Sequence, residues 1–201
     1  MTAARDALLA KVVAHYAEHG VRDTSLRSLA AAIGTSQRML HYHFGSREDV
    51  LTAVIDAVAG GQAERIGRLF DEEPDRTAAG DLNWRKTVEG AEVFGALWFE
   101  LATHAMRHEP YAARLGEVMV AAQVREFTRL YAERTTADKA ARLARLTLAV
   151  GQGLIFGLLI DRDLLDVVHQ RGAFARLQAR WQIYRPIGEG RLLSARLEAA
   201  Q

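Results

Sequence analysis

One glycine near the start of this 201-residue chain constrains its fold most, because it separates two short segments that both have helical periodicity. Apolar residues recur over 26–33 at the spacing of an amphipathic helix, and a Ser or Thr at 24–25 can cap that helix. Gly34 accepts the left-handed backbone that ends a helix, and Thr35 or Ser36 can cap the next one. The segment therefore predicts two helices joined by a sharp turn, as in a helix-turn-helix unit.

The second predicted helix, over about residues 36–44, has an apolar and a polar face. A step of about 100° per residue places Leu40 on one side with Ser36 and His43, and Phe44 then returns to the core. The other side carries groups that hydrogen-bond base edges and phosphate oxygens, namely Gln37, Arg38, His41 and Tyr42. This pattern predicts a helix that enters the major groove of DNA.

Further helices are predicted on both sides of this pair. An apolar stripe that includes Leu8, Val12 and Tyr16 predicts a first helix that stops at Gly20. The spacing of Ser46 and Asp49 predicts a capping box that opens a long fourth helix, from about Arg47 to Phe70. Arg47 lies near its N-terminus, where a phosphate can be gripped. Acids, proline and glycine over residues 71–83 then predict a loop.

These residues resemble the DNA-binding domain of the TetR (tetracycline repressor) family of bacterial regulators, over roughly residues 5 to 55. The family pattern, approximately T-x-x-x-I-A-x-x-x-G-V-S-x-x-x-L-Y-x-H-F-x-x-K, appears here from Ser25 to Arg47. The family's usual Tyr is His41, with a Tyr at the next position, and Arg47 replaces its usual Lys and keeps a phosphate grip. Together with the polar helix face, the resemblance implies DNA contacts from Ser25, Arg27, Ser36, Gln37, Arg38, His41, Tyr42, His43 and Arg47.

With 49% hydrophobic residues, the chain can form a hydrophobic core that needs no covalent cross-links. It has no cysteine, so disulfides and thiolate metal sites are excluded. The net charge is only +1, but residues 1–47 carry +3 and the remainder −2, so the basic surplus lies with the motif. The start of the chain lacks the apolar run of a secretory signal, and we expect a cytoplasmic location. The run from Leu146 to Ile160 is short of the roughly 20 residues that span a bilayer, which predicts a buried helix and no membrane partner.

The rest of the chain has only helical periods, predicted over residues 84–108, 112–134, 139–160 and 164–184, with no strand alternation. The fold class is therefore all-α, with a three-helix DNA-binding domain at residues 1–47 and a second helical domain at residues 48–201. Helix four, about 47–70, connects the two.

The second domain resembles the regulatory domain of TetR-type proteins more weakly. The resemblance implies a pocket for a small-molecule effector, here partly apolar, and a homodimer formed through the last two long helices. Large or polar residues that can line such a pocket are Trp98, Phe99, Met106, Met119, Gln123, Phe127, Gln152 and Phe156. The implied function is a ligand-responsive repressor that binds a palindromic double-stranded DNA operator as a dimer.

Two other classes of function would use some of the same residues. A small helical enzyme or a lipid-binding module would use the C-terminal cavity, but no phosphate loop, nucleophile elbow or zinc motif is present, so we predict no catalytic residue, metal or cofactor. Glu100, His104 and His108 share one helix face at metal-ligand spacing, although a solvated polar edge explains the pattern better. An activator, or an architectural protein without a ligand, would use the same DNA contacts.

Overall fold

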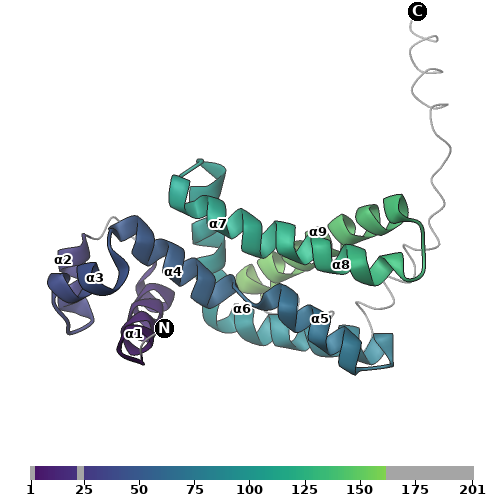
Figure 1. The fold of residues 1–201 in the computed structure, drawn as a ribbon, viewed down its shortest axis with the longest axis horizontal. Helices are drawn as coiled ribbons and strands as arrows, with labels where there is room; N and C mark the ends of the chain where they lie inside the picture. The colour runs from purple at the N-terminus through teal and green to yellow at the C-terminus, as the bar shows by residue number, and fades with distance from the viewer. Residues whose placement is uncertain (1–2, 22–24, 162–201) are drawn as a thin grey trace, which may run out of the picture.

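The structure, a computed structural model, describes residues 3–21 and 25–161, and every regular element in that part of the chain is helical, as predicted (Figure 1). The predicted helix at 164–184 and the tail after Pro186 lie outside the described residues. In chain order the elements are α1 (Ala3–His19), α2 (Leu26–Ala32), α3 (Gln37–Phe44), α4 (Arg47–Ala59), α5 (Gln62–Glu72), α6 (Arg76–Met106), η1 (Pro110–Ala112), α7 (Ala113–Leu115), η2 (Gly116–Ala121), α8 (Ala122–Ala132) and α9 (Ala137–Ile160).

Serine caps begin three of the four N-terminal helices, which confirms the local predictions. Ser25 Oγ and Ser36 Oγ each accept a hydrogen bond of 3.2 Å from the backbone N–H three residues later. Gly34, between α2 and α3, has a left-handed φ of +68°. Ser46 and Asp49 form a capping box in which each side chain accepts from the other residue's backbone N–H, at 3.1 and 2.8 Å. The helix-turn-helix is thus specified by local chemistry.

The predicted single helix from Arg47 to Phe70 is wrong, because α4 ends at Ala59 and α5 begins at Gln62. Gly61 has a left-handed φ of +76°, and a Cβ atom on Gly60 would lie 2.3 Å from the Asp56 carbonyl oxygen. Only glycine accommodates both positions without a shift. The apolar period continues across this pair, so periodicity alone did not reveal the break.

The loop predicted over residues 71–83 is also mostly wrong. Asp75 caps the next helix by accepting hydrogen bonds from the backbone N–H groups of Thr77 and Ala78. The helix α6 therefore begins at Arg76 and continues for 31 residues. A short acidic cap explains why this proline-containing and glycine-containing stretch is helical.

The helix predicted over residues 112–134 is divided. It begins with the 3₁₀ turn η1 and the short α7, widens into the six-residue π-helix η2, and continues as α8 to Ala132. His108, just before this segment, has a positive φ of 60°. Segments of π-helix are rare and often lie at functional sites, and η2 borders the cavity described below.

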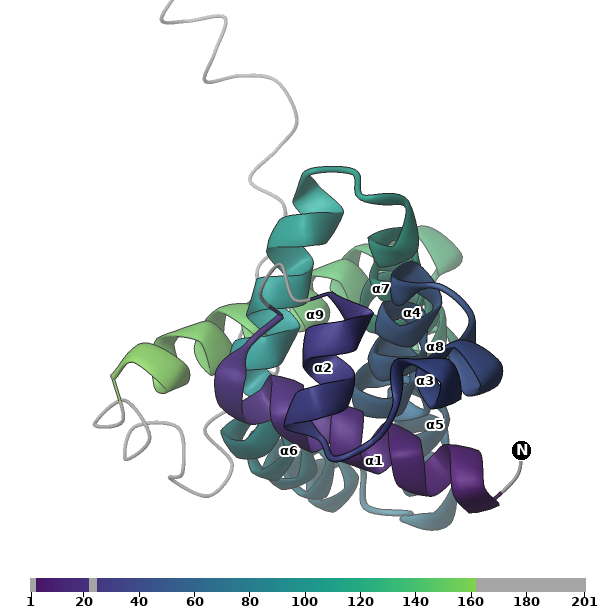
Figure 2. The same cartoon turned by 90° about the vertical axis from the view of Figure 1, so that its left-hand side faces the viewer.

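The first three helices gather at one end of the molecule, and α4 leads from them into a bundle of α5, α6, α8 and α9 (Figures 1 and 2). One cluster of buried apolar side chains extends through both parts, with members such as Val12, Leu40, Ile55, Leu101 and Ile155. Because α4 contributes to this shared core, the N-terminal unit and the bundle are mechanically joined.

The prediction that Leu146–Ile160 forms a buried helix is wrong for one face of α9. Phe156 is 51% exposed and Ile160 71% exposed, since α9 packs on α6 and α8 with its other face. By length and composition alone α9, with 24 residues, is the one helix of the described residues that would suffice to cross a membrane, because its most apolar stretch of 18 residues has a mean hydropathy of 1.8. A helix that packs in a bundle can meet the same criteria.

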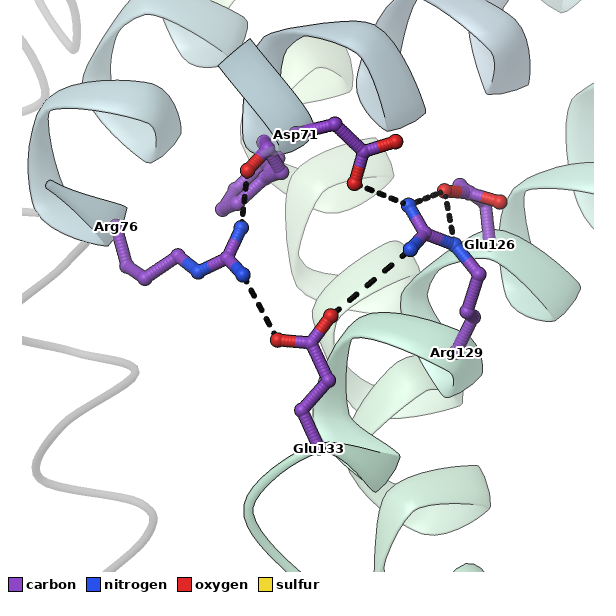
Figure 3. Close-up of polar contacts among 6 residues, drawn as sticks. Asp71, Arg76, Glu126, Arg129 and Glu133 are labelled. Carbon is purple, nitrogen blue, oxygen red and sulfur yellow. Dashed lines mark hydrogen bonds and ion pairs between the residues drawn. The ribbon is translucent and has the colours of Figure 1, made fainter. Parts of the chain in front are cut away.

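Ion pairs hold the end of the bundle that lies farthest from α3 (Figure 3). Arg76 at the start of α6 pairs with Glu133 at 2.8 Å, and Arg129 of α8 reaches Asp71 of α5 at 3.0 Å and Glu126 at 2.6 Å. Each partly exposed pair contributes at most about 1 kcal/mol. Together they hold the ends of α5 and α6 against α8.

Candidate DNA-binding helix and internal cavity

The two faces of α3 differ as the sequence predicts. Leu40 is fully buried in the core, whereas Gln37, Arg38, His41 and Tyr42 are exposed, and Tyr42 is 80% exposed. The helix lies at one end of the molecule, in front of the bundle in Figure 2. Its polar face is therefore open to a large ligand.

Hydrogen bonds orient the ring of His41, which stands where the family pattern has Tyr. Its Nδ1 lies 2.8 Å from the Gly45 carbonyl oxygen, and its Nε2 lies 3.2 Å from Gln37 Nε2. A carbonyl only accepts, so Nδ1–H donates to Gly45. The imidazole is thus positioned by its own helix before any DNA is bound.

The other predicted DNA contacts lie around this face. Ser25 and Ser36 are exposed caps, and Arg27 is exposed on α2. His43 is half-buried, and its carbonyl oxygen accepts a hydrogen bond of 3.2 Å from Arg5 Nε, which ties α3 to α1.

Arg47 differs from the other predicted contacts because it is half-buried at the start of α4. Burial raises the pKa values of Tyr16 and Tyr111, and the nearby positive charge of Arg47 opposes that rise in both. Arg47 is therefore close to α1 and to the segment that follows α6.

A cavity of about 360 Å³, partly open to solvent, lies between the helices of the bundle and is bordered by α5, α6, η2, α8 and α9. This volume is in the range of small-molecule sites. Among the described residues its wall contains no Asp, Glu, Lys, Arg or His. Seven of the eight predicted pocket residues lie in that wall: Trp98, Phe99, Met106, Met119, Gln123, Phe127 and Gln152.

Phe156 is the predicted pocket residue that the structure places elsewhere, which corrects that assignment. It does not line the cavity, and its exposed ring packs edge-on against Phe99 at a centroid distance of 5.3 Å. A helical wheel alone could not decide which face of α9 turns inward.

Polar side chains that the sequence analysis missed also line the cavity. Gln62 accepts a buried hydrogen bond of 2.9 Å from Gln123 Nε2, across 61 positions of the chain. Thr147 is buried and bonds to the Tyr131 hydroxyl at 2.7 Å. The only sequence signal for Gln62 was a polar residue directly after two glycines, and its partner could not be inferred.

Trp98 connects the cavity wall to α4. Its indole Nε1–H donates a buried hydrogen bond of 3.1 Å to the backbone carbonyl of Val58. That carbonyl lies in the last turn of α4, where no intrahelical donor is available. A molecule in the cavity that displaces Trp98 would therefore also disturb the end of α4.

The histidines and the carboxylate at metal-ligand spacing do not converge. His104 Nδ1 lies 2.6 Å from the Tyr111 hydroxyl, and His108 is exposed. No group of three or more ligating side chains comes together in residues 3–21 and 25–161.

Comparisons with known proteins match this geometry. A sequence model described as bacterial regulatory proteins, tetR family, matches residues 8–54, from α1 into α4. The HTH-type transcriptional dual regulator CecR of Shigella flexneri is 36% identical over 87 residues, which is 39% of this chain and 39% of that protein. The chain thus aligns with less than half the length of this curated relative.

Solved structures extend the likeness of fold to the bundle. A protein from Rhodococcus sp. described as a TetR-family transcriptional regulator has a TM-score of 0.61 and 21% identity, over 89% of this chain and 96% of that chain. The multidrug binding protein EbrR, complexed with proflavin, has a TM-score of 0.56 and 22% identity, over 88% of this chain and 98% of that chain. Residues 8–54, which hold the helix-turn-helix, thus match the tetR family of bacterial regulatory proteins, and the chain shares its fold with these two solved structures.

Proposed function

We propose that this protein is a cytoplasmic repressor that binds a palindromic operator as a homodimer and leaves it when a small molecule occupies the cavity. The observation that carries the proposal is the exposed, donor-bearing face of α3 at one end of the molecule. The match of residues 8–54 to a family of regulatory proteins supports regulation rather than catalysis.

The exposed side chains of α3 suit the major groove. Arg38 can donate two hydrogen bonds to a guanine edge, and Gln37 matches an adenine edge. Tyr42 and His41 reach phosphate or base edges, and Ser25, Arg27, Ser36, His43 and Arg47 complete the proposed contacts. Phosphate contacts fix register and base contacts specify sequence.

A dimer would give α9 a use for its exposed apolar face. Phe156 and Ile160 lie on that face, and covering such surface is favourable at about 25 cal/mol per Å². The second helix of the proposed interface, at 164–184, lies outside the described residues. Two copies of α3 would then meet half-sites about 34–36 Å apart on one side of DNA.

The cavity is the proposed effector site, lined by Trp98, Phe99, Met106, Met119, Gln123, Phe127 and Gln152. EbrR, described as a multidrug binding protein, shares this fold and binds proflavin. An effector would act by favouring one arrangement of α4, whose last turn bonds to Trp98 just before the glycine pair Gly60–Gly61. A preference of about 1–3 kcal/mol changes operator affinity by roughly 5-fold to 150-fold.

Operator binding tests the proposal directly. Purified protein is titrated with its own upstream DNA at fixed salt, alongside Arg38→Ala, Tyr42→Ala and the control Arg85→Ala, an exposed arginine of α6. We expect Arg38→Ala to weaken specific binding by about 1–3 kcal/mol and Arg85→Ala to leave it unchanged. Full affinity and sequence preference in both α3 variants would show that α3 does not read DNA.

The sign of regulation needs a separate measurement. A reporter under the same upstream region is compared with and without the gene for this protein. We expect higher expression without it. Lower expression would identify an activator that uses the same contacts.

A further inference from the structure

We infer that the effector is an uncharged planar molecule, mostly apolar, with a hydrogen-bond donor at one end. This inference rests on the proposed function of the cavity as the effector site. It concerns the charge of the ligand, which the fold of the family leaves open, and it follows from which side chains form the wall and which lie behind it.

The first argument is the charge of the cavity. None of the described residues in its wall is ionisable, so a charged ligand would lose its water and gain no opposite charge. Arg65 donates from Nη2 to the hydroxyl of Thr87, a wall residue, at 3.2 Å. Among described residues no carboxylate pairs with Arg65, and its Nε is buried without a hydrogen-bond partner. This positive charge, one hydrogen bond behind the wall, repels a cation.

A ligand with a carboxylate should bind more tightly than a cationic ligand but less tightly than a neutral one. The Arg65 guanidinium does not itself line the cavity, and the donors that do are amides and hydroxyls. Neutral donors hydrogen-bond a carboxylate without neutralising it, so its desolvation is only partly repaid. The wall thus favours a ligand with dipoles and no net charge.

The second argument is the polar end of the cavity. Asn83 lines it, and its Oδ1 is buried with no hydrogen-bond partner within the described part of the chain. The neighbouring Thr87 hydroxyl is already used, since it donates to the Asn83 backbone oxygen at 2.9 Å. A buried acceptor without a donor costs about 1–3 kcal/mol. A ligand N–H or O–H would satisfy it once the Asn83 amide turns toward the cavity.

The third argument is the shape of the apolar wall. Trp84, Trp98, Phe99 and Phe127 all line the cavity, and aromatic rings pack well against flat ring systems in offset or edge-on contact. Met119, on the π-helix η2, is an adaptable neighbour for such a ring. A fused-ring ligand of about three rings suits a cavity of about 360 Å³.

Three tricyclic probes that differ in charge test the inference. Acridone is neutral and carries one N–H, proflavin is a cation at neutral pH, and anthracene-9-carboxylate is an anion. Quenching of Trp84 and Trp98, which lie in the wall, reports binding to the full-length protein. We expect acridone to bind at least tenfold tighter than proflavin and tighter than the anion. Equal or tighter binding of either charged probe, or no binding of acridone, would overturn the inference.

A charge placed in the cavity should reverse the preference. Gln123→Glu is isosteric and introduces a carboxylate at a buried wall position. Arg85→Gln changes the net charge by the same amount on the outside of α6. We expect Gln123→Glu to raise proflavin affinity relative to acridone at least fivefold, and Arg85→Gln to leave the ratio within twofold. An unchanged ratio in a folded Gln123→Glu protein would place the probe elsewhere and overturn the inference.

Operator binding, measured on the same wild-type sample, distinguishes failure of the proposed ligand charge from failure of the proposed regulatory function. If the wild-type protein binds its operator but prefers proflavin, the inference about ligand charge fails and the regulator remains. If it binds acridone but no operator, the proposed function fails instead.

Discussion

Replacing Trp98 with phenylalanine removes one hydrogen bond between the cavity wall and α4 and keeps most of the aromatic packing. The indole Nε1–H donates to the Val58 carbonyl at 3.1 Å, and Trp98 is only 6% exposed. Without that donor, the carbonyl at the end of α4 is left buried and unsatisfied, which costs about 1–3 kcal/mol. For a chain of this length each kcal/mol lowers the melting temperature by about 2–4 °C. A loss near 2 kcal/mol therefore predicts a fall of about 4–8 °C.

Thermal unfolding followed by circular dichroism at 222 nm measures this change. Phe99→Leu is the matched control, because Phe99 lines the same cavity beside Trp98 but has no hydrogen bond to lose. Because Phe99 is only half-buried, we expect its replacement to cost less than leaving a buried carbonyl unsatisfied. If Trp98→Phe melts no lower than Phe99→Leu, the bond to Val58 does not stabilise α4 and the reasoning is refuted.

Two further predictions concern the N-terminal unit. Gly34→Ala should lower stability by about 1–2 kcal/mol through its left-handed backbone alone, since a Cβ there meets no atom of the described residues within 4 Å. Gly45→Ala should cost more, because its Cβ would lie 2.7 Å from Asp49 Oδ2. Equal melting temperatures of the two variants would contradict this order. Hydrogen bonds from Ser46 lower the pKa of Asp49, so its stabilisation is present above the unfolded aspartate pKa of about 3.9 and is lost as the pH falls through the lower folded pKa. Melting curves between pH 7 and pH 3 should therefore show a smaller acid loss in Asp49→Asn than in the wild type.

The N-terminal helices were predictable because their signals are local. Ser25, Ser36 and Gly34 act on backbone groups within a few residues of themselves, so a single sequence contains the whole interaction. The alternation of buried Leu40 with exposed Tyr42 follows from helix geometry in the same way.

Only part of the cavity wall was predictable from the sequence, because the geometry of the cavity depends on distant contacts. The bond between Gln62 and Gln123 joins residues 61 positions apart, and no periodicity records such a pair. The break at Gly60–Gly61 was hidden by an apolar stripe that continues from α4 into α5. Phe156 was misplaced because α9 is apolar on both its inner and its outer face.

A hybrid sensor that joins this N-terminal DNA-binding unit to another regulator's ligand domain would be cut most simply at Gly60–Gly61, where α4 ends and α5 begins. The carbonyl of Val58 would then enter the graft without the indole that satisfies it here. A donor domain with a tryptophan at the position equivalent to Trp98 would restore this hydrogen bond. A donor domain without one would be connected to the N-terminal unit by the chain but not by this bond. The choice of donor can thus be screened by inspecting a single position before any chimera is made.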